Sequence, residues 1–242
     1  MERKTEWFEN WFDTSYYHLL YDYRDEQEAV FFMNNLIQHL GLQKGNSILD
    51  LPCGMGRHAM FLSSQGFKVV GADLSVNNIL QAKRSENDNL RFTQHDMRDP
   101  LSGSYHAIFN LFTSFGYFEK EETNIAVLRN FKNALYPHGH LVIDFLNLHK
   151  VRSELVPEQH FFKNNIEFIV KKTIDNNFII KEIEVIDANE THHFIEKVQA
   201  LDLTKIRRFA KAAGLEIDQV FGDYDLHPFL PQSSERLILV MR

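Results

Sequence analysis

Short apolar runs alternate with amphipathic stretches through the first two thirds of the chain. Continuous apolar runs of strand length predict β-strands at residues 47–51, 67–73, 89–96, 105–113 and 140–147. Apolar positions at helical spacing predict helices between them, at residues 57–65, after a capping Ser75, and at residues 119–136. Buried strands that alternate with helices are typical of a parallel sheet covered on both faces. The pattern therefore predicts a doubly wound α/β core.

The pattern changes after residue 150. Residues 159–201 are interpreted as three strands separated by polar turns at 175–177 and 187–190, which predicts antiparallel hairpins. A helix at 204–213 precedes two strands with no room for a helix between them, so these should run antiparallel. The predicted fold class is α/β: a Rossmann-like, doubly wound, mostly parallel seven-stranded sheet with an antiparallel last strand, plus a small antiparallel β insertion.

Aromatic side chains crowd the amino-terminal 23 residues. Trp7 and Trp11, like Phe8 and Phe12, are spaced four apart and share a helical face. An amphipathic helix over residues 25–40 follows and ends at Gly41. We expect three parts: an aromatic-rich helical lid at residues 1–44, a main ligand-binding domain at 45–150 and 202–242, and an inserted β subdomain on the substrate side at 151–201.

Composition narrows the class of protein. The 242 residues are 44% hydrophobic, enough for one sizeable core, and the net charge of -7 disfavours nucleic acid as a partner. The charged amino terminus contains no apolar leader, and no apolar run reaches the roughly 20 residues that span a bilayer. We therefore expect a cytoplasmic protein with no membrane partner. Cys53 is the single cysteine, which excludes an internal disulfide.

A glycine turn, DLPCGMGRH (50–58), follows the first predicted strand. Gly54 and Gly56 loosely fit the glycine motif of dinucleotide-binding proteins, and Asp73 ends the next strand 19 residues after Gly54. An acid at that place can accept hydrogen bonds from two ribose hydroxyls. The pattern predicts an adenosine ligand, and at this level NAD fits as well as any other.

Two further acids favour a ligand without phosphate. Asp50 ends the first strand, where it would repel a pyrophosphate and attract an ammonium or a sulfonium. It could instead only hold the amides of the glycine loop. Asp96 closes the third strand, where it can accept a hydrogen bond from an adenine amino group while Met97 packs on the ring. A ribose, an adenine and a cation together describe S-adenosylmethionine.

Five segments resemble the successive motifs of class I S-adenosylmethionine-dependent methyltransferases. They are DLPCGMGRH, VVGADLS, FTQHDMRD, FNLFTSFGYF and LYPHGHLVIDFLN, and they lie within residues 45–147. The resemblance implies that the glycine turn passes under the methionine part of the cofactor and that the backbone at 110–112 meets its amino acid end. It also implies that Arg24 clamps the methionine carboxylate. The full predicted cofactor site is Arg24, Asp50, Pro52, Gly54, Gly56, Asp73, Leu74, Asp96, Met97, Asn110, Leu111 and Phe112.

More narrowly, the chain resembles small-molecule N-methyltransferases of the dTDP-aminosugar and glycine type. The supporting features are the Tyr-rich start ahead of Glu28 and Ala29, the turn TSFGY after the fourth strand, the β insertion and the closing SERLILV. The resemblance implies methyl transfer to a nitrogen or oxygen of a small molecule by a monomer or homodimer. RNA or protein methylation, a catalytically silent cofactor-binding module and an NAD-dependent oxidoreductase remain alternatives.

The predicted catalytic residues lie outside the cofactor motifs. Tyr17 and Tyr117 are expected to orient the acceptor, and His149 to accept a proton where one must be removed. Arg57 and His58 place cations at a helix start, which suggests either a bound carboxylate or a local ion pair. The twelve histidines include no pair at the spacing of an open metal site, so no metal is expected.

Overall fold

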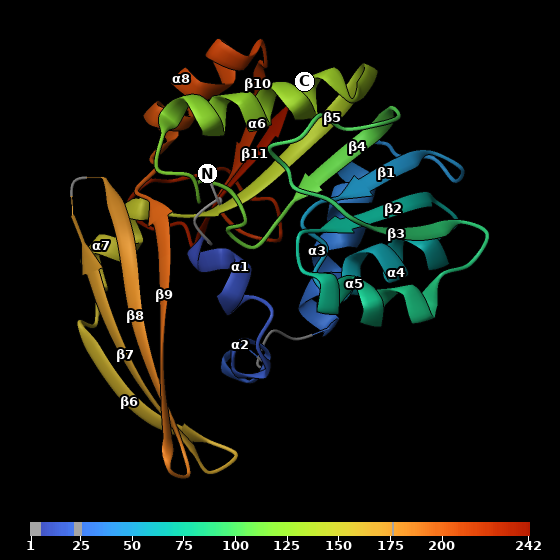
Figure 1. The fold of residues 1–242 in the computed structure, drawn as a ribbon. Helices are drawn as coiled ribbons and strands as arrows, with labels where there is room; N and C mark the ends of the chain where they lie inside the picture. Colours follow the sequence, from blue (N-terminus) through green and yellow to red (C-terminus); the bar gives the residue numbers. More distant parts are fainter. Residues whose placement is uncertain (1–5, 22–25, 176) are drawn as a thin grey trace, which may run out of the picture.

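The computed structural model describes residues 6–21, 26–175 and 177–242, and these form two β-sheets with helices around the larger one (Figure 1). The larger sheet contains β1 (Ser47–Asp50), β2 (Lys68–Asp73), β3 (Leu90–Gln94), β4 (Tyr105–Asn110), β5 (Leu135–Leu146), β10 (Ile217–Phe221) and β11 (Arg236–Met241). The smaller sheet contains β6 (Glu158–Lys163), β7 (Ile166–Ile174), β8 (Phe178–Asp187) and β9 (Glu190–Gln199).

The seven-stranded sheet has the order β10-β11-β5-β4-β1-β2-β3. β1 is parallel to both of its neighbours, β2 and β4, whereas β11 is antiparallel to both β10 and β5. This confirms the predicted fold class, including the antiparallel last strand. The strand order reverses between β1 and β4, and ligands of such sheets bind beyond the carboxyl ends of the strands at this point.

Helices cover both faces of the larger sheet (Figure 1). The helices of the structure are α1 (Trp7–Trp11), α2 (Ser15–Leu20), α3 (Glu26–His39), α4 (Arg57–Ser64), α5 (Val76–Ala82), the short 3-10 turn η1 (Lys83–Ser85), α6 (Glu121–Asn133), α7 (Leu148–Ser153) and α8 (Leu203–Ala213). One face of the sheet is covered by α3, α4 and α5, and the other by α6 and α8. Each face has its own apolar core. No helix among the described residues is long and apolar enough to cross a membrane.

Two strand boundaries differ from the prediction. β5 begins at Leu135 instead of residue 140, because the expected turn is an irregularity within the strand where the pairing with β4 shifts. β4 ends at Asn110 instead of residue 113, because Phe112 and Thr113 turn into the left-handed region with φ of 57° and 64°. The polypeptide therefore leaves the sheet earlier than its apolar residues suggest.

The smaller sheet has four strands where three were predicted. The missed connection lies between β6 and β7, at Asn164 and Asn165, whose φ values are 51° and 66°. A two-residue turn with both residues left-handed suits the right-handed twist of a hairpin, and asparagine is among the residues that most readily adopt this conformation. The turn is too short to interrupt the apolar and polar pattern, so the sequence was interpreted as one continuous strand.

The helices α1 and α2 lie between the two sheets (Figure 1). Trp11 and Leu20 are buried against the smaller sheet, where they pack with Phe168 and Val185. Phe8 instead belongs to the core of the larger sheet. The amino-terminal helices thus bridge the two sheets, which are also connected where the side chain of Gln199 in β9 donates to the carbonyls of Phe118 and Glu119.

Candidate active site

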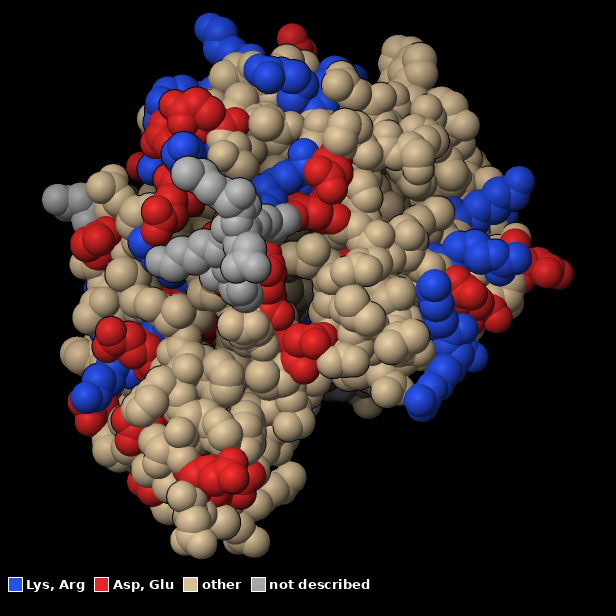
Figure 2. Space-filling model, in the orientation of Figure 1, with Lys and Arg blue, Asp and Glu red and all other residues tan. Residues whose placement is uncertain are grey.

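A cavity of about 830 Å³ lies beyond the carboxyl ends of β1, β2 and β4, against α1 and α2. Figure 2 shows a hollow at the centre of this face, with acidic side chains beside it. Among the described residues that line the cavity, four carry a carboxylate and one, Arg57, carries a guanidinium. The carboxylates are Glu9, Asp13, Asp73 and Asp96. Such a wall attracts cationic ligands and repels phosphates.

The glycine turn is held against the end of β2. Gly54 and Gly56 both have positive φ, 54° and 88°, which residues with side chains adopt only at a cost. A Cβ on Gly56 would also lie 2.5 Å from the Phe92 ring, so only glycine fits there. The peptide bond before Pro52 is cis, and Pro52 and Gly54 line the cavity. The turn thus brings polypeptide backbone to the cavity wall at Gly54, whereas Gly56, also predicted as a cofactor residue, lies outside the cavity.

Asp73 forms the end of β2 and faces the same cavity. The amides of Gly54 and Ser75 donate to its two oxygens, each at 2.8 Å. Burial raises the pKa of Asp73, and these hydrogen bonds oppose the rise. An ionised carboxylate can accept about four hydrogen bonds, so capacity remains for hydroxyl groups of a ligand. Leu74, the next residue, also lines the cavity.

The hydrogen bond that the Gly54 amide makes distinguishes between NAD and S-adenosylmethionine, two ligands that the sequence left open. In a dinucleotide site the glycine loop and the helix after it direct free N–H groups at a pyrophosphate. Here the Gly54 amide donates to Asp73 instead, and the following helix begins with a cation, Arg57. A sulfonium ligand with a ribose and an ammonium group fits this set of acceptors, whereas a pyrophosphate would face carboxylates.

Asp50 lies behind the glycine turn, 1% exposed. Burial, together with the nearby Asp73, raises its pKa to about 8. The amide of Ala59 hydrogen-bonds to Asp50, and among the described residues its Oδ2 has no hydrogen-bond partner. A buried acceptor without a donor is costly, so a donor or cation that approaches the turn is stabilised here. Asp50 itself does not line the cavity.

Asp96 and Met97 lie at the cavity beyond β3. The Nε of Arg98 donates to both oxygens of the Asp96 carboxylate, at 2.9 and 3.0 Å. Arg98 also pairs with Glu6 ahead of α1, at 3.2 Å. The side-chain amide of Asn130 donates to three carbonyls of this loop, including that of Met97. The loop is therefore rigidly held, and acceptance of an adenine amino group by Asp96 stays a prediction.

The residues after β4 are partly in the cavity. Leu111 and Phe112 line it, whereas Asn110 is buried outside it and donates to the carbonyl of Leu51 at 2.9 Å. Phe112 and the following Thr113 are left-handed without being glycine, which costs on the order of 1–2 kcal/mol for each residue. The ring of Phe112 stacks on His58, with 5.2 Å between centroids and 12° between planes. The Arg57 guanidinium lies 4.7 Å from the same ring.

Tyr17 and Tyr117 come together around Phe12. Their rings lie 4.9 Å and 5.6 Å from that of Phe12, and both tyrosines line the cavity. His149 does not join them, because it is exposed in the first turn of α7 and lies outside the cavity. Arg24 lies outside the described residues.

Several cavity residues were not predicted from the sequence. Asp13 accepts hydrogen bonds from the Ser75 hydroxyl and, at 2.7 Å, from Asn77 Nδ2, and so fastens α1 to the start of α5. His18 of α2 and Glu9 of α1 also line the cavity. The aromatic pattern placed these helices on the cavity, but nothing local marks which polar residues between the aromatics face it.

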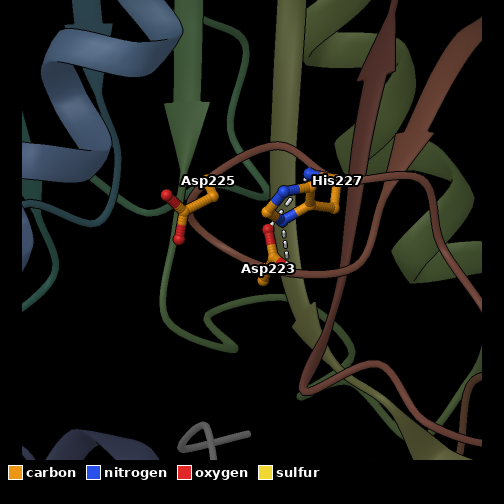
Figure 3. A group of neighbouring side chains, drawn as sticks. All are labelled: Asp223, Asp225 and His227. Carbon is orange, nitrogen blue, oxygen red and sulfur yellow. Dashed lines mark hydrogen bonds and ion pairs between the residues drawn. The ribbon is translucent and has the colours of Figure 1, made fainter.

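One group of possible metal ligands occurs among the described residues, away from the cavity. Asp223, Asp225 and His227 lie in the loop between β10 and β11 (Figure 3). Asp223 accepts from the backbone N–H of His227 at 3.0 Å and pairs with its Nδ1 at 2.9 Å. These contacts close a turn within an exposed loop, so the cluster has a structural explanation.

The fold is that of class I methyltransferases, and comparison with known proteins agrees. Residues 48–139 match the family model of a methyltransferase domain. The chain is 26% identical to a cypemycin N-terminal methyltransferase from Streptomyces sp, over 82% of this chain and 84% of that protein. It is 35% identical to a glycine/sarcosine N-methyltransferase from Halorhodospira halochloris, over 52% of this chain and 48% of that one.

A solved structure shows the same fold over nearly the whole chain. An S-adenosylmethionine-dependent methyltransferase from Clostridium acetobutylicum superimposes with a TM-score of 0.79 at 18% identity, covering 94% of this chain and 95% of that one. Relatives of the dTDP-aminosugar type also match, so both sides of the narrower resemblance are confirmed. The chain is an S-adenosylmethionine-dependent methyltransferase, and its cofactor is S-adenosylmethionine.

Proposed function

We propose that the enzyme methylates the nitrogen of a small amine. The observation that carries this proposal is the side of the cavity formed by α1 and α2, where the carboxylates of Glu9 and Asp13 line the cavity together with aromatic rings. Ammonium groups bind well between carboxylates and aromatic faces. The relatives support it, because the glycine/sarcosine enzyme is named an N-methyltransferase, the dTDP-aminosugar enzyme an N,N-dimethyltransferase and the cypemycin enzyme an N-terminal methyltransferase.

The two sides of the cavity are proposed to bind the cofactor and the acceptor respectively. Residues 45–150 and 202–242 would form the cofactor-binding domain, with Asp73 on the ribose, Asp96 and Met97 beside the adenine, and Phe112 at the amino acid end. Residues 1–44 would act as a lid, and residues 151–201 as the support on the substrate side. The cofactor supplies an activated methyl group on a sulfonium, so the protein needs no covalent intermediate.

The residues of this chain then have three tasks. Tyr17 and Tyr117 would hold the amine in line with the methyl group, roughly 3–3.5 Å away, while the aromatic lid excludes water. The amine must react in its neutral form. His18 lines the cavity beside Tyr17, with 5.4 Å between ring centroids, and we assign to it the proton acceptance that the sequence suggested for His149.

The first test is a calorimetric titration with S-adenosylhomocysteine, with NAD run in parallel. We expect micromolar binding of the former alone, and the reverse result would remove the proposal. A panel of small amines is then incubated with S-adenosylmethionine and analysed by mass spectrometry. N-acetylated forms of the same compounds, which keep any hydroxyl groups, are the matched controls. Methylation of the acetylated forms would indicate an oxygen acceptor instead.

The role of His18 has its own test. We expect His18→Gln to lower kcat, while His149→Gln leaves it unchanged. An unchanged kcat in the His18→Gln variant would argue that the amine loses its proton to solvent.

A further inference from the structure

The ion pair between β5 and β11, in which Asp144 is fully buried and the Arg236 side chain is 20% exposed, has no part in the proposed chemistry. Asp144, at 0% exposure, lies near the carboxyl end of β5, and its Oδ1 accepts from Arg236 Nε at 2.7 Å. The two strands are already paired along six residues, from Arg236 with Leu146 to Met241 with Leu141. The sheet therefore has its full backbone ladder without the two charges.

The remaining bonds of the pair reach the loop after β4. Asp144 Oδ2 accepts from the amide of Phe112 at 2.8 Å, and the Asp144 carbonyl accepts from the amide of Thr113 at 2.9 Å. Arg236 Nη2 donates to the Thr113 hydroxyl at 3.1 Å. Tyr224 OH also reaches Asp144 Oδ2, at 3.3 Å. Three hydrogen bonds from the pair thus converge on two consecutive residues.

Those two residues have the conformation that most needs support. Phe112 and Thr113 are both left-handed, and Thr113 is β-branched, for which this region is an outlier. Such conformations persist only where the surroundings fix them, and they concentrate at functional sites. The ion pair supplies that support to both residues.

The supported turn shapes the cavity. It directs the Phe112 ring into the cavity wall, where the ring stacks on His58 at 5.2 Å and lies 4.7 Å from the Arg57 guanidinium. These contacts gather one side chain from the loop after β4 and two from the start of α4 at one end of the cavity. A displacement of the turn would move all three.

We infer that Asp144 and Arg236 are positioning residues, which hold the left-handed turn at Phe112 and Thr113 against the amino acid end of the bound cofactor. The inference rests on the proposed placement of that end beside Phe112. Asp73 and Asp96, at the other end of the cavity, belong to separate strand ends and share no hydrogen bond with the pair among those described. The pair should therefore affect one half of the cofactor only.

The test compares two ligands that differ in that half. S-adenosylhomocysteine carries the amino acid end, and 5′-methylthioadenosine lacks it. The variant is the double substitution Asp144→Asn with Arg236→Met, because removing one charge alone would leave the other buried and unpaired. We expect its affinity for S-adenosylhomocysteine to fall at least tenfold and its affinity for 5′-methylthioadenosine to stay within twofold of wild type. Thermal unfolding without ligand confirms that the variant is folded.

A rescue variant separates support of the turn from a general packing effect. Thr113→Gly, added to the double variant, removes the penalty for the left-handed conformation at that position. We expect it to recover about half or more of the lost affinity on a logarithmic scale. Ala188→Gly is the matched control, because Ala188 is also left-handed, at φ 53°, but lies in the β8–β9 hairpin. It should recover nothing.

Three outcomes would overturn the inference. Unchanged affinity of the double variant for S-adenosylhomocysteine would show that the turn needs no pair. Equal losses for both ligands, or equal recovery by the Ala188→Gly control, would show a general effect on the fold. Failure of the proposed function looks different, because the wild-type chain itself would then bind 5′-methylthioadenosine and S-adenosylhomocysteine equally or not at all.

Discussion

The two sides of the cavity are held together by different means. On the larger sheet, Asp73 is fixed by backbone amides from its own loop and from the glycine turn 19 residues before it. On the smaller sheet, Glu196 of β9 accepts from Trp11 Nε1 at 2.8 Å and from Tyr21 OH at 2.7 Å, across 185 and 175 residues. The proposed ribose end of the cofactor side thus depends on turns that are close in the sequence, whereas the proposed acceptor side depends on side chains that meet only in the folded chain. Substitutions on the two sides should therefore have separable effects.

The largest effect is expected on the cofactor side. Asp73→Ala removes the acceptor of the Gly54 and Ser75 amides together with the proposed ribose contact. Since hydrogen bonds to a charged group contribute about 1.5–3 kcal/mol each, we expect S-adenosylhomocysteine to bind about 100-fold more weakly in calorimetry. Asp88→Ala, at an exposed acid, is the control and should bind normally. A loss below about threefold would remove Asp73 from the site.

A second prediction for the cofactor side concerns Asp50 and the pH dependence of the free energy of unfolding. Burial raises its pKa from 3.8 to about 8, so the folded chain keeps a proton that the unfolded chain releases. Stability is therefore full at acidic pH and falls as pH rises toward 8. We expect Asp50→Asn to lose less stability than wild type between about pH 5 and about pH 8, by up to about 4 kcal/mol in denaturant unfolding. Parallel profiles for the two proteins would mean that Asp50 stays ionised in the folded chain.

Glu196 tests the other side. Glu196→Ala removes the common partner of Trp11, Tyr21 and Lys181 and so loosens α1 and α2 from β9. We expect the KM for the amine to rise about tenfold, equivalent to ~1.4 kcal/mol, while S-adenosylhomocysteine binds within twofold of wild type. Glu190→Ala, at the exposed end of the same strand, is the matched control. An equal loss for both ligands would show that the two sides are not separable.

The smallest effect is expected far from the cavity. Asn165 is left-handed at φ 66° in the turn between β6 and β7, so Asn165→Gly should stabilise the chain by roughly 0.5 kcal/mol. Asn165→Ala should destabilise it. Both should bind cofactor and amine normally, measured by thermal unfolding and calorimetry. A change in either affinity would mean that the smaller sheet transmits its stability to the cavity.

The strand ends and the glycine turn could be predicted from the sequence because their determinants are local. Strand ends, the glycine turn and Asp73 follow from apolar runs and from residues that tolerate positive φ. The same reasoning located the Ser75 cap, which accepts from the amide of Asn78 at 3.0 Å. Elements that are fixed by residues close in the sequence can be recognised from the local sequence pattern.

The rest could not be predicted because its determinants are distant. The contact of Arg236 with Asp144 joins residues 92 apart, and Trp11 with Glu196 joins residues 185 apart. Neither pair shows a spacing that pattern analysis can detect. The position of His149 after β5 indicates a place near the acceptor, yet His149 lies in helix α7 and is exposed. Position after a strand places a residue near the cavity but does not set the direction of its side chain.

Phe92 has a consequence for how this sequence can vary. Its ring lies where a Cβ on Gly56 or on Gly71 would come within 2.5 Å, so one aromatic side chain fills the space left by two glycines. Gly71 sits in β2 with ordinary strand geometry, so the main obstacle to alanine there is the ring, with Cys53 Sγ at 3.1 Å from the same Cβ position. Positions 71 and 92 should therefore covary, and a library randomised at both should return alanine at 71 only beside a smaller residue at 92.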